Sequence, residues 1–155
     1  MRALQVSDDQ PAEERRRWLG VLARATEDAV RALLPTAPTL PSYRVLRGPE
    51  LGMVMVRGRI GGDGAPFNLG EMTVVRCTVQ CGDTLGHAIV AGRNVRHAEL
   101  AAHLDAALQQ PALAGALQRA VIAPLALAEA RQRERESRQA AATRVDFATL
   151  ATMRG

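Results

Sequence analysis

Residues 52–99 constrain the fold more than any other part of the chain, because three short runs of alternating residues follow one another there. The runs cover residues 53–60, 72–80 and 85–90, and side chains of two kinds alternate along them with the period of a strand. Turn-forming, glycine-containing sequence separates the runs, which favours hairpins between neighbours. The stretch therefore predicts a small antiparallel sheet of about three to four strands. Residues 43–46 are the candidate for a fourth strand, and its partner stays open.

Helical patterns lie on both sides of this sheet. Residues 11–34 carry a first helical region, and a linker with prolines at three positions separates it from the strands. Because Thr26, Glu27 and Asp28 resemble the start of a fresh helix, the region is either one helix or two. Together with the region described next, this pattern predicts a single α+β domain over residues 1–155, with the sheet within residues 43–90 and helices before and after it.

The second helical region covers residues 95–142 and begins after Asn94, a residue type that favours the N-cap of a helix. Pro111 is expected to end its first helix and Pro124 to interrupt the next one. From residue 127 onward the sequence is rich in helix formers and opposite charges but has a thin apolar face, so this part is either solvated or covered by a partner. The buried stripe of the first helix is expected to contain Leu100, Leu104, Ala107 and Leu108.

The two ends of the chain give different expectations. Residues 1–10 have no periodic apolar face, and we expect them to be disordered or to form a cap. Residues 143–155 form a tail in which Val145, Phe147 and Leu150 are apolar residues beyond a polar helix. Such side chains need cover, and we expect the tail to contact another subunit.

Charge and composition exclude some function classes. All 20 residues counted as lysine or arginine are arginines, and the formal net charge is +4, which suits an anionic substrate or partner. Aromatic residues make up only 3% of the chain, which disfavours a nucleic-acid-binding protein that stacks bases. The sequence shows no signal-peptide h-region and no apolar run of transmembrane length, so we expect a cytoplasmic location and no membrane contact. Cys77 and Cys81 are expected to be buried free thiols.

Three arginines are the first candidates for a binding site. Arg57, Arg59 and Arg76 come from neighbouring predicted strands, and if these pair as a hairpin the guanidinium groups converge on one face, where they could bind phosphate or contact a partner. The alternative is that they form ordinary ion pairs with acids such as Glu50, Glu71 or Glu99. The glycine-rich sequence GGDG at 61–64 lacks the lysine and the following helix of a phosphate-binding loop, which favours a hairpin loop.

The histidines and the second helical start supply the remaining candidates. His87 and Glu99 are weak candidates for acid–base chemistry, and His97 and Arg93 are candidates for substrate or partner contact. The free N–H groups after Asn94 would form an anion site of low specificity. His87, His97, His103 and Glu99 do not have the spacing of metal ligands, so no metal site is expected.

Four stretches together resemble one known family, the PhnG family, which comprises the G subunit of the bacterial carbon-phosphorus lyase system. They are RRRWLGVLARA, GMVMVRGRIGGDGAPFNLGEMTVVRCTVQ, GHAIVAGRNVRHAEL and TRVDFATL, in the order of the family. The sequence QCGDT departs from the family pattern, which tends to be aliphatic where Cys81 stands.

The resemblance implies a small cytoplasmic α+β subunit of a complex with H, I and J subunits. It implies a function, together with the H, I and L proteins, in transferring the ribose triphosphate part of ATP to methylphosphonate with release of adenine. MgATP would then be a substrate of the complex, no cofactor would be bound by this chain alone, and a homodimer contact inside the complex is possible. The resemblance assigns no catalytic role to any residue and implies that the chain is not catalytic alone.

Two other functions remain open at this point. The chain itself could be the phosphate-binding catalytic unit, with the arginines, His87 and the helix start at Asn94 forming the site. Less favoured is a basic nucleic-acid-binding module, which would require salt-dependent binding.

Overall fold

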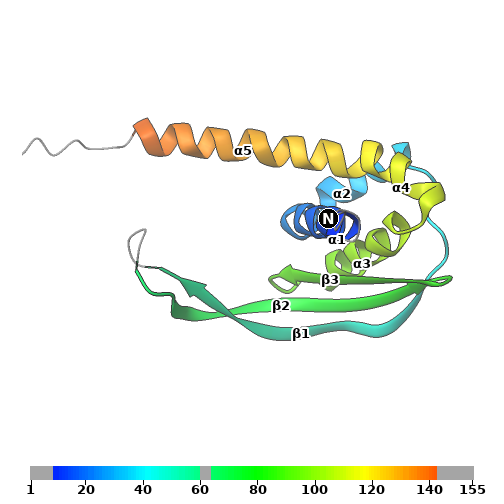
Figure 1. Cartoon of the computed structure of the whole chain (residues 1–155), viewed down its shortest axis with the longest axis horizontal. Helices are drawn as coiled ribbons and strands as arrows, with labels where there is room; N and C mark the ends of the chain where they lie inside the picture. The colour runs from blue at the N-terminus through cyan, green and yellow to red at the C-terminus, as the bar shows by residue number, and fades with distance from the viewer. Residues whose placement is uncertain (1–8, 60–63, 143–155) are drawn as a thin grey trace, which may run out of the picture.

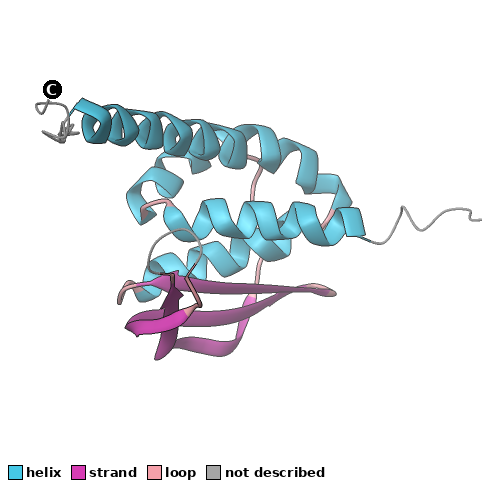
Figure 2. Ribbon diagram, turned by 60° about the vertical axis from the view of Figure 1, so that its left-hand side comes forward, coloured by secondary structure: helices cyan, strands magenta, loops and turns pink. Residues whose placement is uncertain are grey.

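The computed structural model describes residues 9–59 and 64–142, and its helices lie on one side of a three-stranded antiparallel sheet (Figures 1 and 2). The strands are in the order β1-β2-β3, and the opposite side of the sheet carries no helix of the described chain. The α+β prediction is therefore confirmed. The elements are α1 Asp9–Arg24, α2 Glu27–Leu33, the 3-10 turn η1 Leu34–Thr36, β1 Arg44–Gly58, β2 Phe67–Cys81, β3 Thr84–Ala91, α3 Val95–Leu108, α4 Pro111–Leu117, the π-helical turn η2 Gln118–Ile122 and α5 Ala123–Ala142.

The first two strands are longer than the sequence pattern indicates. The strand expected at residues 43–46 is the beginning of β1, and its partner is the end of β2, with Arg44 opposite Gln80. Gly48 and Pro49 do not form a turn. They lie where the register between β1 and β2 shifts, and residues at such an irregularity need not pair in the regular hydrogen-bond ladder, which glycine and proline fit poorly. β2 begins at Phe67, five residues before the predicted start. The third strand was predicted within one residue at each end.

The core lies between the sheet and α3, which is buried over nearly its whole length. Val75, Cys77, Val79 and Cys81 alternate along β2 toward the helices and are at most 2% exposed. Gly86 on β3 faces α3 so closely that an added Cβ would lie 1.9 Å from the Ala102 carbonyl oxygen. The absence of a side chain there sets the distance between strand and helix. The predicted stripe is confirmed, with Leu100, Leu104, Ala107 and Leu108 all buried.

The first helical region consists of two helices. Thr26 caps α2, since its hydroxyl oxygen accepts a hydrogen bond of 3.2 Å from the backbone N–H of Ala29. The open question of one helix or two is thus resolved by the polar residues at 26–28.

Pro124 does not interrupt the last helix, contrary to the sequence prediction. Residues 111–142 run as one continuous helix of 32 residues, with a π-helical turn just before the proline. In that turn the N–H of Ala123 donates to the carbonyl oxygen of Gln118, five residues back. The wider turn accommodates a residue that has no N–H to donate.

The apolar part of this long helix contains one 18-residue window with a mean hydropathy of 1.4, enough by length and composition to cross a membrane. Its side chains at 117, 121, 122 and 125 are buried in the core and repeat at helical spacing. Such a stripe is typical of a helix packed on a globular core, so packing within the chain accounts for part of its apolar content. From residue 131 onward every described residue of α5 is exposed.

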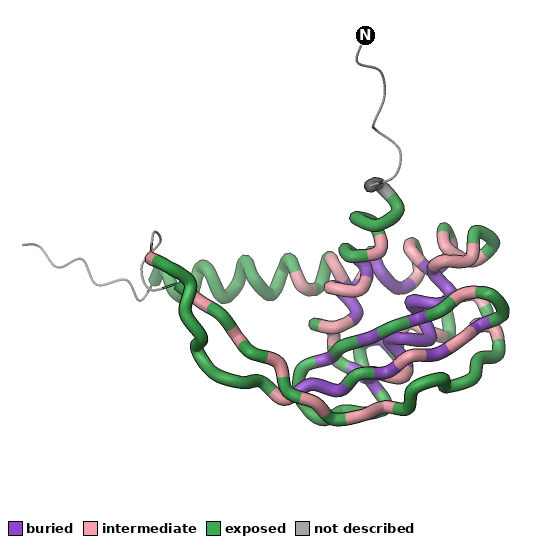
Figure 3. Tube along the Cα trace, turned by 60° about the horizontal axis from the view of Figure 1, so that its bottom comes forward, coloured by how far each residue is buried: buried purple, intermediate pink, exposed green. Residues whose placement is uncertain are grey.

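The part of the β1–β2 hairpin that β3 does not pair with extends past α1 and α3 as a two-stranded arm, on the same side of the molecule as the end of α5 (Figures 1 and 3). Met53 and Met55 are 69% and 52% exposed, and Leu51 is 58% exposed. Large apolar side chains at this exposure are typical of surfaces that another protein covers. The terminal residues 1–8, the segment 60–63 and the tail with Val145, Phe147 and Leu150 lie outside the described residues, so the expectations for them stay predictions.

The two thiols are expected to be inert in the folded protein. Both are buried and free, and burial raises the pKa of Cys77 to about 11 and also raises the pKa of Cys81. Because the thiolate is the reactive form, a disulfide reagent at pH 8 should titrate neither cysteine in the native chain and both after denaturation. Rapid reaction of one thiol before unfolding would contradict the buried positions.

Candidate functional site

The three candidate arginines do not converge. Arg76 lies on the side of the sheet away from the helices, where its Nη2 is 3.1 Å from Glu50 Oε1. Arg57 pairs with Asn68 near the far end of β1. Side chains alternate along β1, so Arg57 is on the face opposite Glu50 and roughly 20 Å farther along the strand. Arg59 is exposed beyond the end of β1. Arg76 thus forms an ion pair with Glu50, one of the acids named in the alternative, while its contact with a partner stays a prediction.

His97 lies in the interior. It is 5% exposed, and its Nε2 is 2.9 Å from the Leu22 carbonyl oxygen, which can only accept a hydrogen bond. The protonated nitrogen therefore ties α3 to α1. This position is not consistent with the predicted contact to a substrate or partner, because the ring is enclosed by this chain.

The start of α3 is occupied by side chains of the chain itself. Asn94 is the N-cap, since its Oδ1 accepts from His97 N at 3.1 Å, and its Nδ2 donates to Glu27 Oε2 at 2.8 Å. Glu27 also contacts Arg31 at 2.7 Å and Arg96 at 3.6 Å. The hydrogen bond from Arg31, followed by that from Asn94, lowers the pKa of Glu27. Glu27 thus places a carboxylate of the chain itself next to the cap residue of α3 and to Arg96, and Arg93 is exposed.

His87 and Glu99 have separate partners. The His87 ring is exposed on the side of the sheet away from the helices, with Nδ1 3.0 Å from Thr78 Oγ1. Glu99 accepts a hydrogen bond of 2.7 Å from the hydroxyl of Tyr43. Among residues 9–59 and 64–142, no cluster of three or more His, Cys, Asp or Glu could hold a metal ion.

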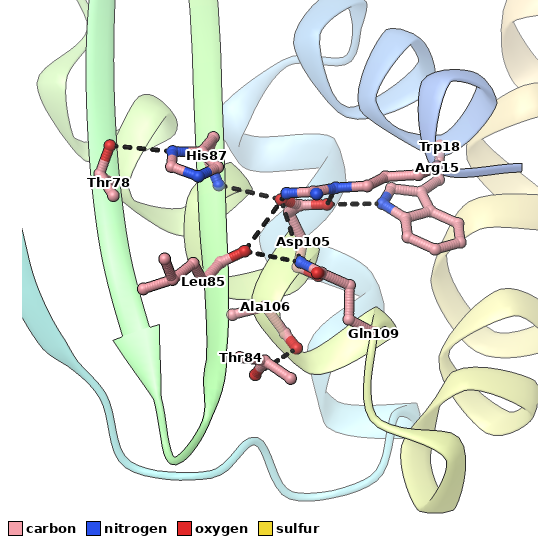
Figure 4. Close-up of polar contacts among 9 residues, drawn as sticks. All are labelled: Arg15, Trp18, Thr78, Thr84, Leu85, His87, Asp105, Ala106 and Gln109. Atoms are coloured by element: carbon pink, nitrogen blue, oxygen red, sulfur yellow. Dashed lines mark hydrogen bonds and ion pairs between the residues drawn. The ribbon is translucent and has the colours of Figure 1, made fainter. Parts of the chain in front are cut away.

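The most connected polar group is Asp105, which the sequence prediction missed. Its carboxylate is fully buried and accepts hydrogen bonds from α1 and β3 (Figure 4). Arg15 reaches both oxygens, with Nε 3.1 Å from Oδ1 and Nη2 2.7 Å from Oδ2. The indole N–H of Trp18 donates to Oδ1 at 2.9 Å, and the backbone N–H of His87 donates to Oδ2 at 2.9 Å. Asp105 therefore joins α3, α1 and β3 at one point.

Side chains near Asp105 also form hydrogen bonds with backbone groups on the free edge of β3, the edge that does not pair with β2. The carbonyl oxygen of Leu85 accepts from Arg15 Nη2 at 3.2 Å and from Gln109 Nε2 at 2.7 Å. Thr84 Oγ1 lies 3.0 Å from the Ala106 carbonyl oxygen and so connects the start of β3 to α3. Side chains thus satisfy edge groups that would otherwise be open to a further strand, which indicates a structural role for Asp105.

A groove beside Asp105 has a volume of about 830 Å³ and lies between α1 and the end of α3. Arg15, Trp18, His87 and Gln109 contribute to its lining. Arg15 and Trp18 are already bound to Asp105, so they are not available as a free acid or base. The groove does not assemble a catalytic group from the predicted candidates.

Tyr43 connects the linker before β1 to α3. Its ring centroid is 4.1 Å from that of His103, whose Nε2 is 2.8 Å from the Pro41 carbonyl oxygen. Burial lowers the pKa of His103. The hydrogen bond to Glu99, followed by burial, raises the pKa of Tyr43 from 10.0 to about 12.

Tyr43 is the single tyrosine of the chain, so its ionisation can be followed directly by ultraviolet absorbance. We expect a midpoint near pH 12 in the wild type and a lower midpoint in Glu99→Gln, because the anionic acceptor is then lost. Since folding raises this pKa, the associated stability is present below pH 10 and lost as the pH rises through 12. An unchanged midpoint in Glu99→Gln would show that the hydrogen bond does not control the phenol.

The fold and these interactions define a small α+β protein whose buried polar groups maintain its own packing. One face of the sheet and the arm are not covered by the described chain, as is typical of a subunit of an assembly. The chain belongs to the family described as phosphonate metabolism protein PhnG, whose model matches residues 13–155. It is 40% identical over 151 residues to alpha-D-ribose 1-methylphosphonate 5-triphosphate synthase subunit PhnG of Rhizobium meliloti (strain 1021), covering 97% of this chain and 96% of that relative.

Proposed function

We propose that this chain is the PhnG subunit of an alpha-D-ribose 1-methylphosphonate 5-triphosphate synthase in phosphonate metabolism. The observation that carries this proposal is the similarity to a subunit of that synthase along nearly the full length of both chains. A similarity that spans every described element concerns the whole fold and not a single motif.

The partners follow from the same proposal. The chain assembles with the H, I and J subunits and acts functionally with the L protein, in the cytoplasm. MgATP and methylphosphonate are the substrates of the complex, and this chain alone binds no cofactor. Its function is to complete or support the catalytic assembly, in which a contact between two copies of this chain is possible.

The arrangement of the open surfaces supports a subunit function. Met53 and Met55 are exposed on the arm and Leu51 is exposed at its base, and apolar side chains at this density favour contact with another protein. The separation of Arg57 from Arg76 argues against the alternative in which this chain forms the phosphate site itself.

Affinity purification after co-expression with the genes that neighbour its own tests the assembly. We expect the tagged chain to retain the H, I and J subunits in fixed stoichiometry. Recovery of the chain alone, with the other subunits forming an active synthase without it, would overturn the proposal.

A further inference from the structure

The side of the sheet away from the helices, here called the outer face, carries an organised set of basic side chains. The register places them in adjacent rows across the strands, with Arg44 opposite Gln80, Arg47 opposite Thr78 and Glu50 opposite Arg76. His87 extends the middle row, because it lies opposite Thr78 on β3. Arg44, Arg47, Arg76 and His87 therefore occupy neighbouring positions on one surface.

Acidic side chains are nearly absent from this surface. The three strands contain two acids, Glu50 and Glu71. Glu71 lies opposite Met55, and the alternation along β1 places this pair on the other face of the sheet. Glu50 is thus the single strand carboxylate facing three arginines, and the outer face has an excess of positive charge.

The arginines are held in place but not saturated. Arg47 Nε and Arg76 Nη2 contact the same oxygen, Glu50 Oε1, at 2.7 and 3.1 Å. Arg44 directs two nitrogens to Gln80 Oε1, at 3.0 and 2.7 Å. Each guanidinium has five N–H donors, so several remain for an external acceptor. The side chains of Arg47 and Arg76 are 65% and 46% exposed, which leaves these donors accessible.

Gly52 helps to fix the position of the Arg76 guanidinium. A Cβ atom added to Gly52 would lie 3.5 Å from Arg76 Nε. The guanidinium of Arg76 therefore lies over the backbone of β1 at a residue that has no side chain. This places Arg76 beside Glu50 and limits its freedom before any partner arrives. A preordered guanidinium loses less entropy on binding a carboxylate.

Apolar side chains on the same face indicate which kind of anion it binds. Leu85 and Ile89 on β3 are 43% and 56% exposed, and Met72 on β2 is 40% exposed. A free triphosphate or a nucleic-acid backbone offers nothing apolar to cover these groups. A protein surface provides both carboxylates and apolar contacts, and arginine and methionine are enriched in such interfaces.

We propose that the outer face binds an acidic surface of a partner subunit, with Arg44, Arg47 and Arg76 as its anchors. This inference rests on the proposed function, since it requires the synthase assembly. A second copy of the chain is the wrong occupant for this face, because two copies meeting there would place arginines against arginines.

The test uses charge reversal in the co-expressed assembly. Arg47→Glu combined with Arg76→Glu is expected to reduce recovery of the partner subunits at least about tenfold at physiological salt. The matched control is Arg16→Glu combined with Arg17→Glu, two exposed arginines on α1 in the helical layer, which should assemble like the wild type. For each variant, thermal unfolding of the free chain, expected to match the wild type, separates lost binding from lost folding.

The outcomes distinguish this inference from the proposed function. If the wild type itself fails to assemble, the proposed function is wrong. If the wild type and the double variant assemble equally well, the outer face is not the acidic contact. Intact assembly with a raised KM for MgATP would also overturn the inference, because the face would then bind the anionic substrate.

Discussion

Replacing Asp105 by alanine should lower the free energy of unfolding by about 3 kcal/mol or more, the largest effect that we expect from a single polar substitution. The carboxylate is fully buried and accepts from Trp18 and from the backbone of His87, so its removal leaves two enclosed N–H groups without an acceptor. Arg15 loses its bidentate partner as well, although its side chain is 33% exposed and can turn toward water. Urea denaturation of the free chain measures the change.

Asp28→Ala is the matched control, because this aspartate is exposed on α2. We expect it to cost less than about 1 kcal/mol, the scale of a charge in the first turn of a helix. Asp105→Asn keeps one carbonyl acceptor and should fall between the two, which preserves the test if Asp105→Ala does not fold. Equal stabilities of Asp105→Ala and Asp28→Ala would contradict the central position of Asp105.

Gly86→Ala should lower the free energy of unfolding about as much as Asp105→Ala, for a different reason. The new methyl group would lie 1.9 Å from the Ala102 carbonyl oxygen and 2.7 Å from the backbone nitrogen of Ala106. These are backbone atoms of α3, so no side-chain rotation relieves the overlap. Moving β3 away from α3 would also lengthen the hydrogen bond between His87 and Asp105. We expect a loss of about 3 kcal/mol, at the upper end of the cost of overpacking a core.

Gly48→Ala provides the control, since an added Cβ there has no atom within 4 Å. Any effect of that substitution should stay within about 0.5 kcal/mol. Thermal unfolding of both variants measures the difference. A Gly86→Ala protein as stable as Gly48→Ala would show that the strand and the helix do not approach as closely as described.

The sequence predicts the strands best where alternation is undisturbed. β3 was located within one residue, because each of its side chains matches a strand with one buried face. β1 was predicted too short, since Gly48 and Pro49 are turn residues in isolation and only pairing with β2 keeps them in a strand. Pro124 misled the prediction similarly, because a π-helical turn absorbs the missing N–H.

Site prediction was limited by the dependence of contacts on tertiary structure. Arg57 and Arg76 belong to paired strands, but only the register shows that they lie on opposite faces and far apart along them. Asp105 had one available signal, a lone acid within an otherwise apolar stretch of α3. Its partners come from 18 and 90 residues away in the sequence, which no local pattern reveals.

We propose that this chain supports catalysis only as part of an assembly. Release of adenine from MgATP in the presence of methylphosphonate measures this directly, for the purified chain and for the co-purified complex at equal concentration, each supplied with the L protein. We expect no release by this chain without the other subunits and steady release by the complex. Turnover by the isolated chain would contradict this proposal.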